Sequence, residues 1–260
     1  MSKTRQPLPQ PKDPTLVRTF GVTFLYPQTL DYPVEQWDSL VYAVRGVVTV
    51  ETPRGSWVLP AQRALWVPIG TPYRLQIPGP VSLRSLYLRA RLSRNMPREC
   101  TAVNVTPLLR ELILAAVRIG ALNSHIAEQA HLAQVIVDQL KGAHAVPLQL
   151  PMPSEERASR AADLMIADPG ARRSRADIAK SAGAGLRTLE RQFREETGMA
   201  IGQWRRRLRI LNALRNLGEG ASVTQVAMEA GYDSVSAFVS MFRRELQVTP
   251  SRYFSSDGQV

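Results

Sequence analysis

One short pattern occurs twice in the last third of this chain, and its spacing constrains the fold more than any other feature. The first copy consists of Ile178, Ala179, Ala182, Gly183, Leu189, Phe193, Arg194 and Trp204. The second consists of Val226, Ala227, Ala230, Gly231, Phe238, Phe242, Arg243 and Tyr253. The copies are 48 residues apart up to the glycine and 49 residues apart after it, so the second copy has one extra residue in its turn.

Each copy is typical of a helix, a tight turn and a second helix. The first alanine of each copy lets two helix backbones approach closely, and the glycine four residues after it suits a turn with a positive φ. This is the pattern of a helix-turn-helix unit, whose second helix enters the major groove of DNA. Ser174 and Ser222 stand where the first helix of each unit should begin, and Ser222 with Gln225 predicts a capping box.

The composition agrees with a DNA partner but does not locate the DNA-binding surface. The chain has 260 residues, room for two ordinary domains, and a net charge of +11 that suits a polyanion. Residues 1–151 carry 16 Lys and Arg against 9 Asp and Glu, and residues 152–260 carry 17 against 13. Because both parts are basic, the repeated motif places the surface and the charge does not.

The cysteine content and the hydropathy pattern favour the cytoplasm. Cys100 is the only cysteine, which excludes a disulfide framework and a thiolate metal cluster. Residues 1–14 are polar and rich in proline, unlike a signal peptide. No apolar run approaches the roughly 18 residues of a transmembrane helix. We therefore expect a cytoplasmic protein without a membrane partner.

The first part of the chain predicts an all-β domain over residues 16–100, after a disordered arm over residues 1–15. Short β-type runs alternate with Gly and Pro turns, as in a sandwich or a barrel. These runs are Leu40–Val44, Val47–Val50, Ser56–Leu59, Ala64–Val67 and Leu83–Leu88.

Helical periods replace the strands over residues 101–145. Leu108, Leu112, Ala115, Ala116 and Ile119 form one apolar stripe, and Ile126, Ala130, Ala133, Val137 and Leu140 form another. These helices could cover the β domain or pair with a second subunit, and we expect a homodimer. A proline-rich linker over residues 146–153 and a helical domain over residues 154–254 follow, then a disordered tail over residues 255–260. A long helix from Ile201 to about Leu217 should set the separation of the two units.

The helical domain resembles the AraC/XylS family of bacterial transcription regulators. The matching residues of the first unit are Asp177, Ile178, Ala179, Arg187, Thr188, Leu189, Arg191, Phe193, Gly202, Trp204, Leu208 and Arg209. Those of the second are Ala227, Gly231, Tyr232, Ser234, Ser236, Phe238, Phe242, Arg243, Thr249, Pro250 and Tyr253. The resemblance implies seven helices and two reading helices set one helical turn of DNA apart. The whole chain is then an α+β regulator that binds double-stranded DNA, and RNA polymerase if it is an activator.

Helical spacing divides each reading helix into a core side and an outward side. In the first, Arg187, Glu190 and Arg191 face outward, and an Arg side chain can bond guanine bidentately. In the second, the outward side chains are small and cannot form such a fork, so we expect weaker sequence discrimination. The candidate DNA-binding residues are Arg187, Thr188, Glu190, Arg191, Arg194, Arg205, Arg206, Arg209, Val235, Ser236, Val239, Ser240 and Arg243.

The β region resembles the cupin-type sensor domain of many such regulators. It shares Trp37, Leu40–Tyr42, Gly46–Thr52, Trp57, Pro60, Arg63–Pro68, Gly70 and Pro72. The three histidine positions of metal-binding cupins hold Pro33, Glu35 and Tyr73, and Ser39 occupies the fourth ligand position. Only Glu35 could bind a metal, and one carboxylate is not a metal site. We therefore expect no metal, no cofactor, no catalytic residues and no enzyme activity.

A small effector could still bind in the β domain. The candidate effector-binding residues are Tyr42, Arg45, Trp57, Trp66, Tyr73 and Arg89, although core packing or surface exposure also accounts for most of them. Three alternatives stay open. They are a regulator whose β domain is only a dimerisation scaffold, a cupin enzyme with an accessory DNA-binding domain, and a DNA alkyl-repair fusion that uses Cys100.

Overall fold

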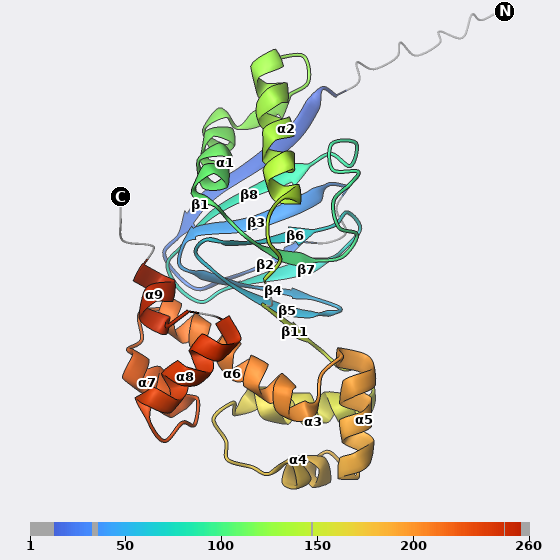
Figure 1. Cartoon of the computed structure of the whole chain (residues 1–260). Helices are drawn as coiled ribbons and strands as arrows, with labels where there is room; N and C mark the ends of the chain where they lie inside the picture. Colours follow the sequence, from blue (N-terminus) through green and yellow to red (C-terminus); the bar gives the residue numbers. More distant parts are fainter. Residues whose placement is uncertain (1–12, 33–35, 147, 247, 256–260) are drawn as a thin grey trace, which may run out of the picture.

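The computed structural model describes residues 13–32, 36–146, 148–246 and 248–255. The predicted arm and tail therefore lie outside the described residues, apart from the arm's residues 13–15 and the tail's residue 255. A β domain comes first and a helical domain follows, so the predicted α+β architecture is confirmed (Figure 1). None of the described helices is long and apolar enough to cross a membrane.

Two antiparallel sheets make up the β domain. Sheet A has the order β10 (Ala121–Asn123), β1 (Thr15–Phe24), β8 (Val81–Leu88), β3 (Asp38–Arg45), β6 (Arg63–Val67), β9 (Thr101–Asn104). Sheet B has the order β11 (Gln149–Pro151), β5 (Gly55–Pro60), β4 (Val47–Thr52), β7 (Tyr73–Ile77), β2 (Gln28–Tyr32). Each of the five predicted strands lies in one of these elements. No hydrogen-bonded closure of the two sheets into a barrel is found among the described strands.

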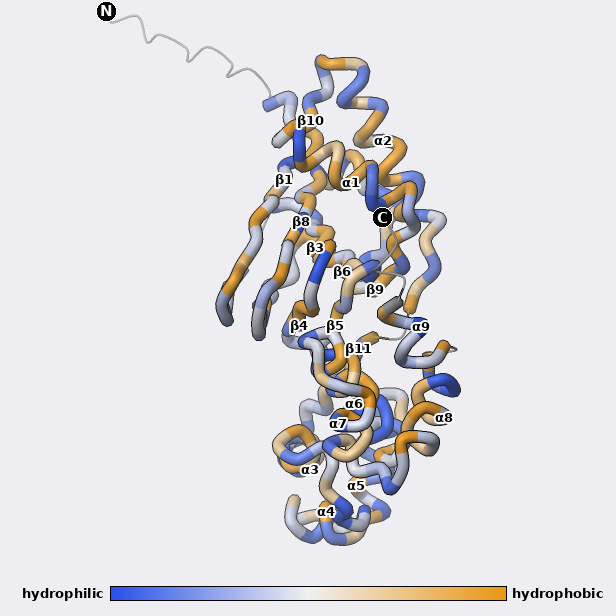
Figure 2. The backbone as a smooth tube through the Cα atoms, turned by 90° about the vertical axis from the view of Figure 1, so that its left-hand side faces the viewer, coloured by the Kyte–Doolittle hydropathy of each residue, from blue (hydrophilic) through white to orange (hydrophobic). Residues whose placement is uncertain are grey.

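The inner faces of the two sheets form one apolar core. Val41 and Leu83 of sheet A share this core with Val50, Trp57 and Leu75 of sheet B. Alternation along each strand places such side chains on one face, which is why the runs of Val, Leu and Trp predicted strands. Figure 2 shows the labelled strands of sheet B, β4, β5 and β11, between sheet A and the helical domain.

The outer face of sheet A is covered by two helices, α1 (Pro107–Ile119) and α2 (Ala127–Lys141). Ile113 of α1 and Val137 of α2 share a second core with Leu40, Tyr42 and Trp66. These helices therefore cover the β domain, which was one of the two predicted uses.

The predicted apolar stripe on α1 faces the core only in part. Leu109, Ile113 and Ala116 are buried, whereas Leu108 and Ile119 are 54% and 48% exposed. Successive helix residues are about 100° apart around the axis. A predicted face that is shifted by one residue along α1 therefore points in a different direction from the buried face.

Residues 149–151 of the predicted linker form β11, which pairs with β5 at the edge of sheet B. Leu148 and Leu150 are buried, and Trp204 donates a hydrogen bond from Nε1 to the Pro151 carbonyl over 2.7 Å. The segment between the domains is thus held by both of them.

The helical domain has the seven helices that the resemblance implied. They are α3 (Glu156–Ala167), α4 (Arg175–Ser181), α5 (Leu186–Thr197), α6 (Ile201–Gly218), α7 (Val223–Glu229), α8 (Val235–Leu246) and α9 (Pro250–Ser255). The buried aromatic rings of Phe193 and Trp204 contact each other edge to face at 5.5 Å, and Phe238 and Phe242 pack at 5.8 Å. Both views show α6 next to β5 and β11, so this helix joins the two helix-turn-helix units and also contacts sheet B.

Candidate nucleic-acid interface

The two predicted turns have the same backbone geometry. Gly183 has a φ of 73° and Gly231 a φ of 76°, both in the left-handed region that favours glycine. The amide of Ala184 donates to Ala179, and the amide of Tyr232 donates to Ala227, over 2.9 and 3.0 Å. The second turn is one residue longer, as the change of offset predicted.

Close packing is a second reason for a glycine at position 231. A Cβ on Gly231 would lie 2.3 Å from the carbonyl oxygen of Gly170, in the loop between α3 and α4. A side chain at Gly231 would therefore force this loop away from the second unit.

The helix starts are capped much as the sequence predicted. Ser174 caps α4 in a full capping box with Asp177, and these hydrogen bonds lower the pKa of the Asp177 carboxyl. Ser222 caps α7 by accepting from the Gln225 amide over 3.1 Å. The Gln225 side chain does not complete the predicted box, because it donates to Glu229 instead.

The first reading helix, α5, presents a charged outward face. Leu189 and Phe193 are fully buried, while Arg187, Arg191 and Arg194 are exposed. Thr188 and Glu190 are half-buried. Arg187 appears in no ion pair of the described residues, so its guanidinium is available to an acceptor.

Two neighbouring charges on α5 are already paired within the protein. Glu190 bonds Arg175 of α4 over 2.8 Å, and Arg191 lies 3.3 Å from Glu195 one turn further on. Exposed pairs of this kind contribute at most about 1 kcal/mol, so DNA can compete for these groups.

The second reading helix, α8, presents small side chains at the same place. Val235, Ser236 and Ser240 are exposed, and Val239 is half-buried. Arg243 is exposed one turn later. The contrast between a charged α5 and a small-residue α8 is therefore also present in the folded chain.

The arginines of α6 are half-buried, and most of them hold the protein together. Arg209 donates to the carbonyls of Pro169 and Ala171 and lies 5.9 Å from the centre of the Tyr232 ring. Arg205 donates to the Arg173 carbonyl over 2.7 Å. Arg206 lies 3.8 Å from Glu245 of α8. These contacts give Arg205 and Arg209 a structural role that helical spacing alone did not reveal.

Comparison with known proteins gives this arrangement a family. Residues 178–256 match the family described as a helix-turn-helix domain. The chain is 31% identical over 228 residues to the HTH-type transcriptional regulator NimR of Escherichia coli strain K12, covering 87% of this chain and 83% of that protein. The chain belongs to the AraC family of helix-turn-helix transcriptional regulators.

Two solved structures of DNA-binding proteins each match about two fifths of this chain. The chain is 28% identical to an AraC-type DNA-binding domain protein from Chromobacterium violaceum, over 40% of this chain and 93% of that one, with a TM-score of 0.37. It is 29% identical to the DNA-binding domain of AdpA, solved in complex with a target DNA, over 39% of this chain and 93% of that one, also with a TM-score of 0.37.

The relatives of this chain agree with the expected lack of enzyme activity. They are transcriptional regulators and not enzymes. Cys100 gives no support to an alkyl-acceptor role, because burial raises the pKa of its thiol to about 11. A thiol with such a pKa is almost wholly protonated, and therefore weakly nucleophilic, at neutral pH.

The structure does not gather the candidate effector residues into one pocket. Tyr42 and Trp66 are buried in the core under α1 and α2, and Trp57 is buried in the core between the sheets. Tyr73 stacks on Tyr32 at 4.7 Å between ring centres. Tyr87 hydrogen-bonds to both, and its burial holds the pKa of its hydroxyl far above the ordinary value.

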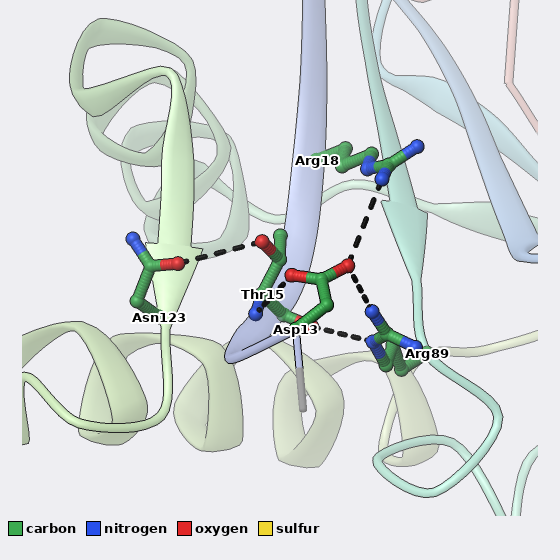
Figure 3. A network of polar contacts seen from close by, with 5 residues as sticks. All are labelled: Asp13, Thr15, Arg18, Arg89 and Asn123. Carbon is green, nitrogen blue, oxygen red and sulfur yellow. Dashed lines mark hydrogen bonds and ion pairs between the residues drawn. The ribbon is translucent and has the colours of Figure 1, made fainter. Parts of the chain in front are cut away.

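The two candidate effector arginines lie away from these aromatic residues. Arg45 is exposed at the end of β3. Arg89 joins the network of Figure 3, in which its guanidinium bonds Asp13 and donates to the Thr15 carbonyl over 2.7 Å. In the same network Arg18 lies 3.7 Å from Asp13, and Thr15 contacts Asn123 of β10. Arg89 therefore fixes the start of β1.

The residues at the metal-ligand positions of cupins are only partly described by the structure. Pro33 and Glu35 lie outside the described residues, while Ser39 is buried in β3. His125, His131 and His144 are all exposed. Within the part of the chain that the structure describes, no three His, Cys, Asp or Glu side chains are grouped to hold a metal ion.

A polar pocket that no sequence pattern indicated lies between sheet B and α6. Arg215 of α6 and Thr49 of β4 line it together, and Arg215 donates to the Thr49 hydroxyl over 3.2 Å. No sequence signal distinguishes Arg215 from the other arginines of α6, because its partner is 166 residues away.

Proposed function

We propose that this regulator reads two successive major grooves of one DNA face, with α5 in the first groove and α8 in the second. The observation that carries the proposal is the repeated helix-turn-helix unit, with matched glycine turns at Gly183 and Gly231. One unit precedes α6 in the chain and the other follows it. That helix, α6, has 18 residues. A helix of this length spans about 27 Å, which suits readers one DNA turn of about 34 Å apart once the flanking turns are added.

Contacts on the DNA divide between base edges and phosphates. Arg187 and Arg191 are the proposed base readers, with Glu190 and Thr188 beside them. On α8 the proposed contacts are Val235, Ser236, Val239 and Ser240. Arg194, Arg206 and Arg243 are proposed phosphate contacts, since most hydrogen bonds to DNA go to its backbone. Arg205 and Arg209 are proposed to position the first unit through their loop contacts.

The test is binding selection on randomised duplexes with the full chain. We expect two recovered half-sites with centres about 10 base pairs apart. Inserting five base pairs between them should abolish the gain from the second half-site, because it rotates one groove to the opposite face. A single recovered half-site, or indifference to the insertion, would contradict two-groove reading.

We also propose that the protein acts in the cytoplasm as a homodimer. Leu108 and Ile119, with Leu112 and Ala115 between them, follow the spacing of one helix face and leave exposed apolar surface on α1. A second copy would bury this face. If the regulator is an activator, RNA polymerase is its further partner.

A small effector is proposed to act through the β domain, since α6 contacts β4, β5 and β11 directly. The alternative is a ligand-independent regulator whose β domain is a scaffold, which the densely buried aromatic residues favour. Thermal stabilisation of the full chain by a small molecule would separate the two, because only a binder of the native state raises the melting temperature.

A further inference from the structure

A pocket of about 410 Å³ lies between the outer face of sheet B and α6. Of its nine lining residues, eight belong to the β domain and one, Arg215, belongs to the helical domain. Sites for small molecules usually have volumes of about 300–1,000 Å³. The pocket can therefore accommodate a small molecule that contacts both domains.

The floor of the pocket is a row of polar side chains on neighbouring strands. Thr29 of β2, Gln76 of β7 and Thr49 of β4 lie side by side in register. The Thr29 hydroxyl donates to Gln76 over 3.0 Å. Pro27 and Pro78 add apolar surface at the edge of this floor. These hydroxyl and amide groups offer both hydrogen-bond donors and acceptors to a bound molecule.

Two side chains of opposite charge also line the pocket. Glu51 is two residues after Thr49 on β4 and lines the pocket, while Arg215 reaches Thr49 from α6. Strand residues i and i+2 share a face about 7 Å apart. The carboxylate and the guanidinium are therefore separate groups on one wall.

Neither Glu51 nor Arg215 is in an ion pair of the described residues, although Glu51 accepts a hydrogen bond from Nε2 of Gln76 over 3.5 Å and is attracted by Arg74. Arg74, opposite Glu51 in the sheet, bonds Asp31 over 2.6 Å, and this contact raises the pKa of its guanidinium. Arg215 forms no ion pair with a carboxylate of the described residues. Glu219, the nearest acidic residue along α6, attracts Arg215 electrostatically, and burial raises the pKa of the Glu219 carboxyl.

We propose that this pocket binds a small amino carboxylate whose two charged ends are separated by several carbon atoms. Arg215 holds the carboxylate, Glu51 holds the ammonium group, and the carbon chain lies against Pro27 and Pro78. This inference rests on the proposed regulator function and names the effector class and its site. Because Arg215 lies on the helix that joins both DNA-binding units, an occupant stabilises the contact between the β domain and that helix.

The experiment is calorimetric titration of the full chain with 4-aminobutyrate and 6-aminohexanoate. Hexanoate and hexylamine serve as analogues of the longer probe that each lack one charge. We expect at least one of the two amino carboxylates to bind. If 6-aminohexanoate is the tighter of the two, hexanoate and hexylamine should each bind at least tenfold more weakly than it does. Tenfold corresponds to about 1.4 kcal/mol. Should 4-aminobutyrate be tighter, butyrate and butylamine take the same place.

Variants locate the binding within the pocket. Arg215→Gln and Glu51→Gln should each weaken the amino carboxylate at least tenfold, and Arg215→Lys should restore part of the affinity. Arg118→Gln, an exposed arginine of α1 far from the pocket, should change nothing. Circular dichroism melting of each variant checks that it is folded.

Two results would overturn the inference. One is no binding of either amino carboxylate up to 10 mM. The other is binding that survives both Arg215→Gln and Glu51→Gln. Operator binding of the unliganded wild type is measured separately. If it is absent, the proposed function fails, whereas intact operator binding with a failed titration removes only the effector site.

Discussion

A Cβ placed on Gly218 of α6 would lie 1.9 Å from Cγ2 of Val47 on β4. The glycine thus allows the last turn of the helix between the two DNA-binding units to contact sheet B. Arg215 contacts Thr49 one turn earlier on the same helix face. These two contacts, together with Trp204 on Pro151, hold the helical domain against the β domain.

Gly218→Ala should therefore destabilise the full chain. Overpacking of a buried contact costs about 1–3 kcal/mol, which exceeds the gain of up to about 1 kcal/mol from replacing a helical glycine. Chemical denaturation followed by circular dichroism measures the change.

Gly202→Ala is the matched control on the same helix. Its Cβ would meet only the flexible end of Arg206, at 3.9 Å, so this variant should be neutral or more stable. The double variant Gly218→Ala with Val47→Ala should lose less stability than the sum of the two single variants. If Gly218→Ala behaves like Gly202→Ala, the two domains are not packed in solution as described.

The two reading helices should contribute unequally to sequence preference. Arg187→Ala or Arg191→Ala should cost roughly 1–3 kcal/mol at the operator if a guanine contact is lost, and should relax preference at one position. Ser236→Ala and Ser240→Ala should cost less, because a hydroxyl forms no fork. Binding selection with each variant provides the measurement. Greater loss of preference in the serine variants would make α8 the main reader.

The exposed face of α1 should carry the dimer contact. Leu108→Glu and Ile119→Glu place a charge on this face and should shift the protein from dimer to monomer in sedimentation at micromolar concentration. Ile166→Glu, at an exposed apolar residue of α3, is the control and should leave the dimer intact. A wild type that sediments as a monomer, with and without DNA, would refute the dimer.

Cys100 should react slowly with alkylating reagents in the folded protein. Its pKa rises from 9.0 to about 11, so at pH 8 the folded chain has about a hundredfold less thiolate than the unfolded chain. The rate should increase with pH until about pH 11. Iodoacetamide labelling at several pH values, with and without denaturant, tests this. Equal rates at pH 8 would contradict a buried thiol.

The purified protein should contain no stoichiometric metal. The reason is the set of residues at the three histidine positions of metal cupins, Pro33, Glu35 and Tyr73. Elemental analysis is the measurement. About one Zn, Fe or Mn per chain that is lost in Glu35→Ala would show that the motif still binds a metal.

Local features of the sequence determined the DNA-binding units. Alternation of apolar residues, serine caps and two glycines with positive φ act within a few residues of one another, so the pattern predicted both units and even the longer second turn. Helical spacing likewise predicted that Leu189, Phe193 and Phe238 lie in the core and that the outward faces of α5 and α8 lie at the surface.

Only the tertiary structure decided which of several chemically similar side chains meet distant partners. Arg209 bonds carbonyls about 40 residues earlier, Arg215 bonds Thr49 of the other domain, and the core face of α1 is set by sheet A rather than by its own period. Helical spacing treats these arginines alike, because it contains no information on what packs against each face. Secondary structure follows from contacts close along the chain, whereas the docking of α6 and the pocket beside it depend on contacts between segments far apart in sequence.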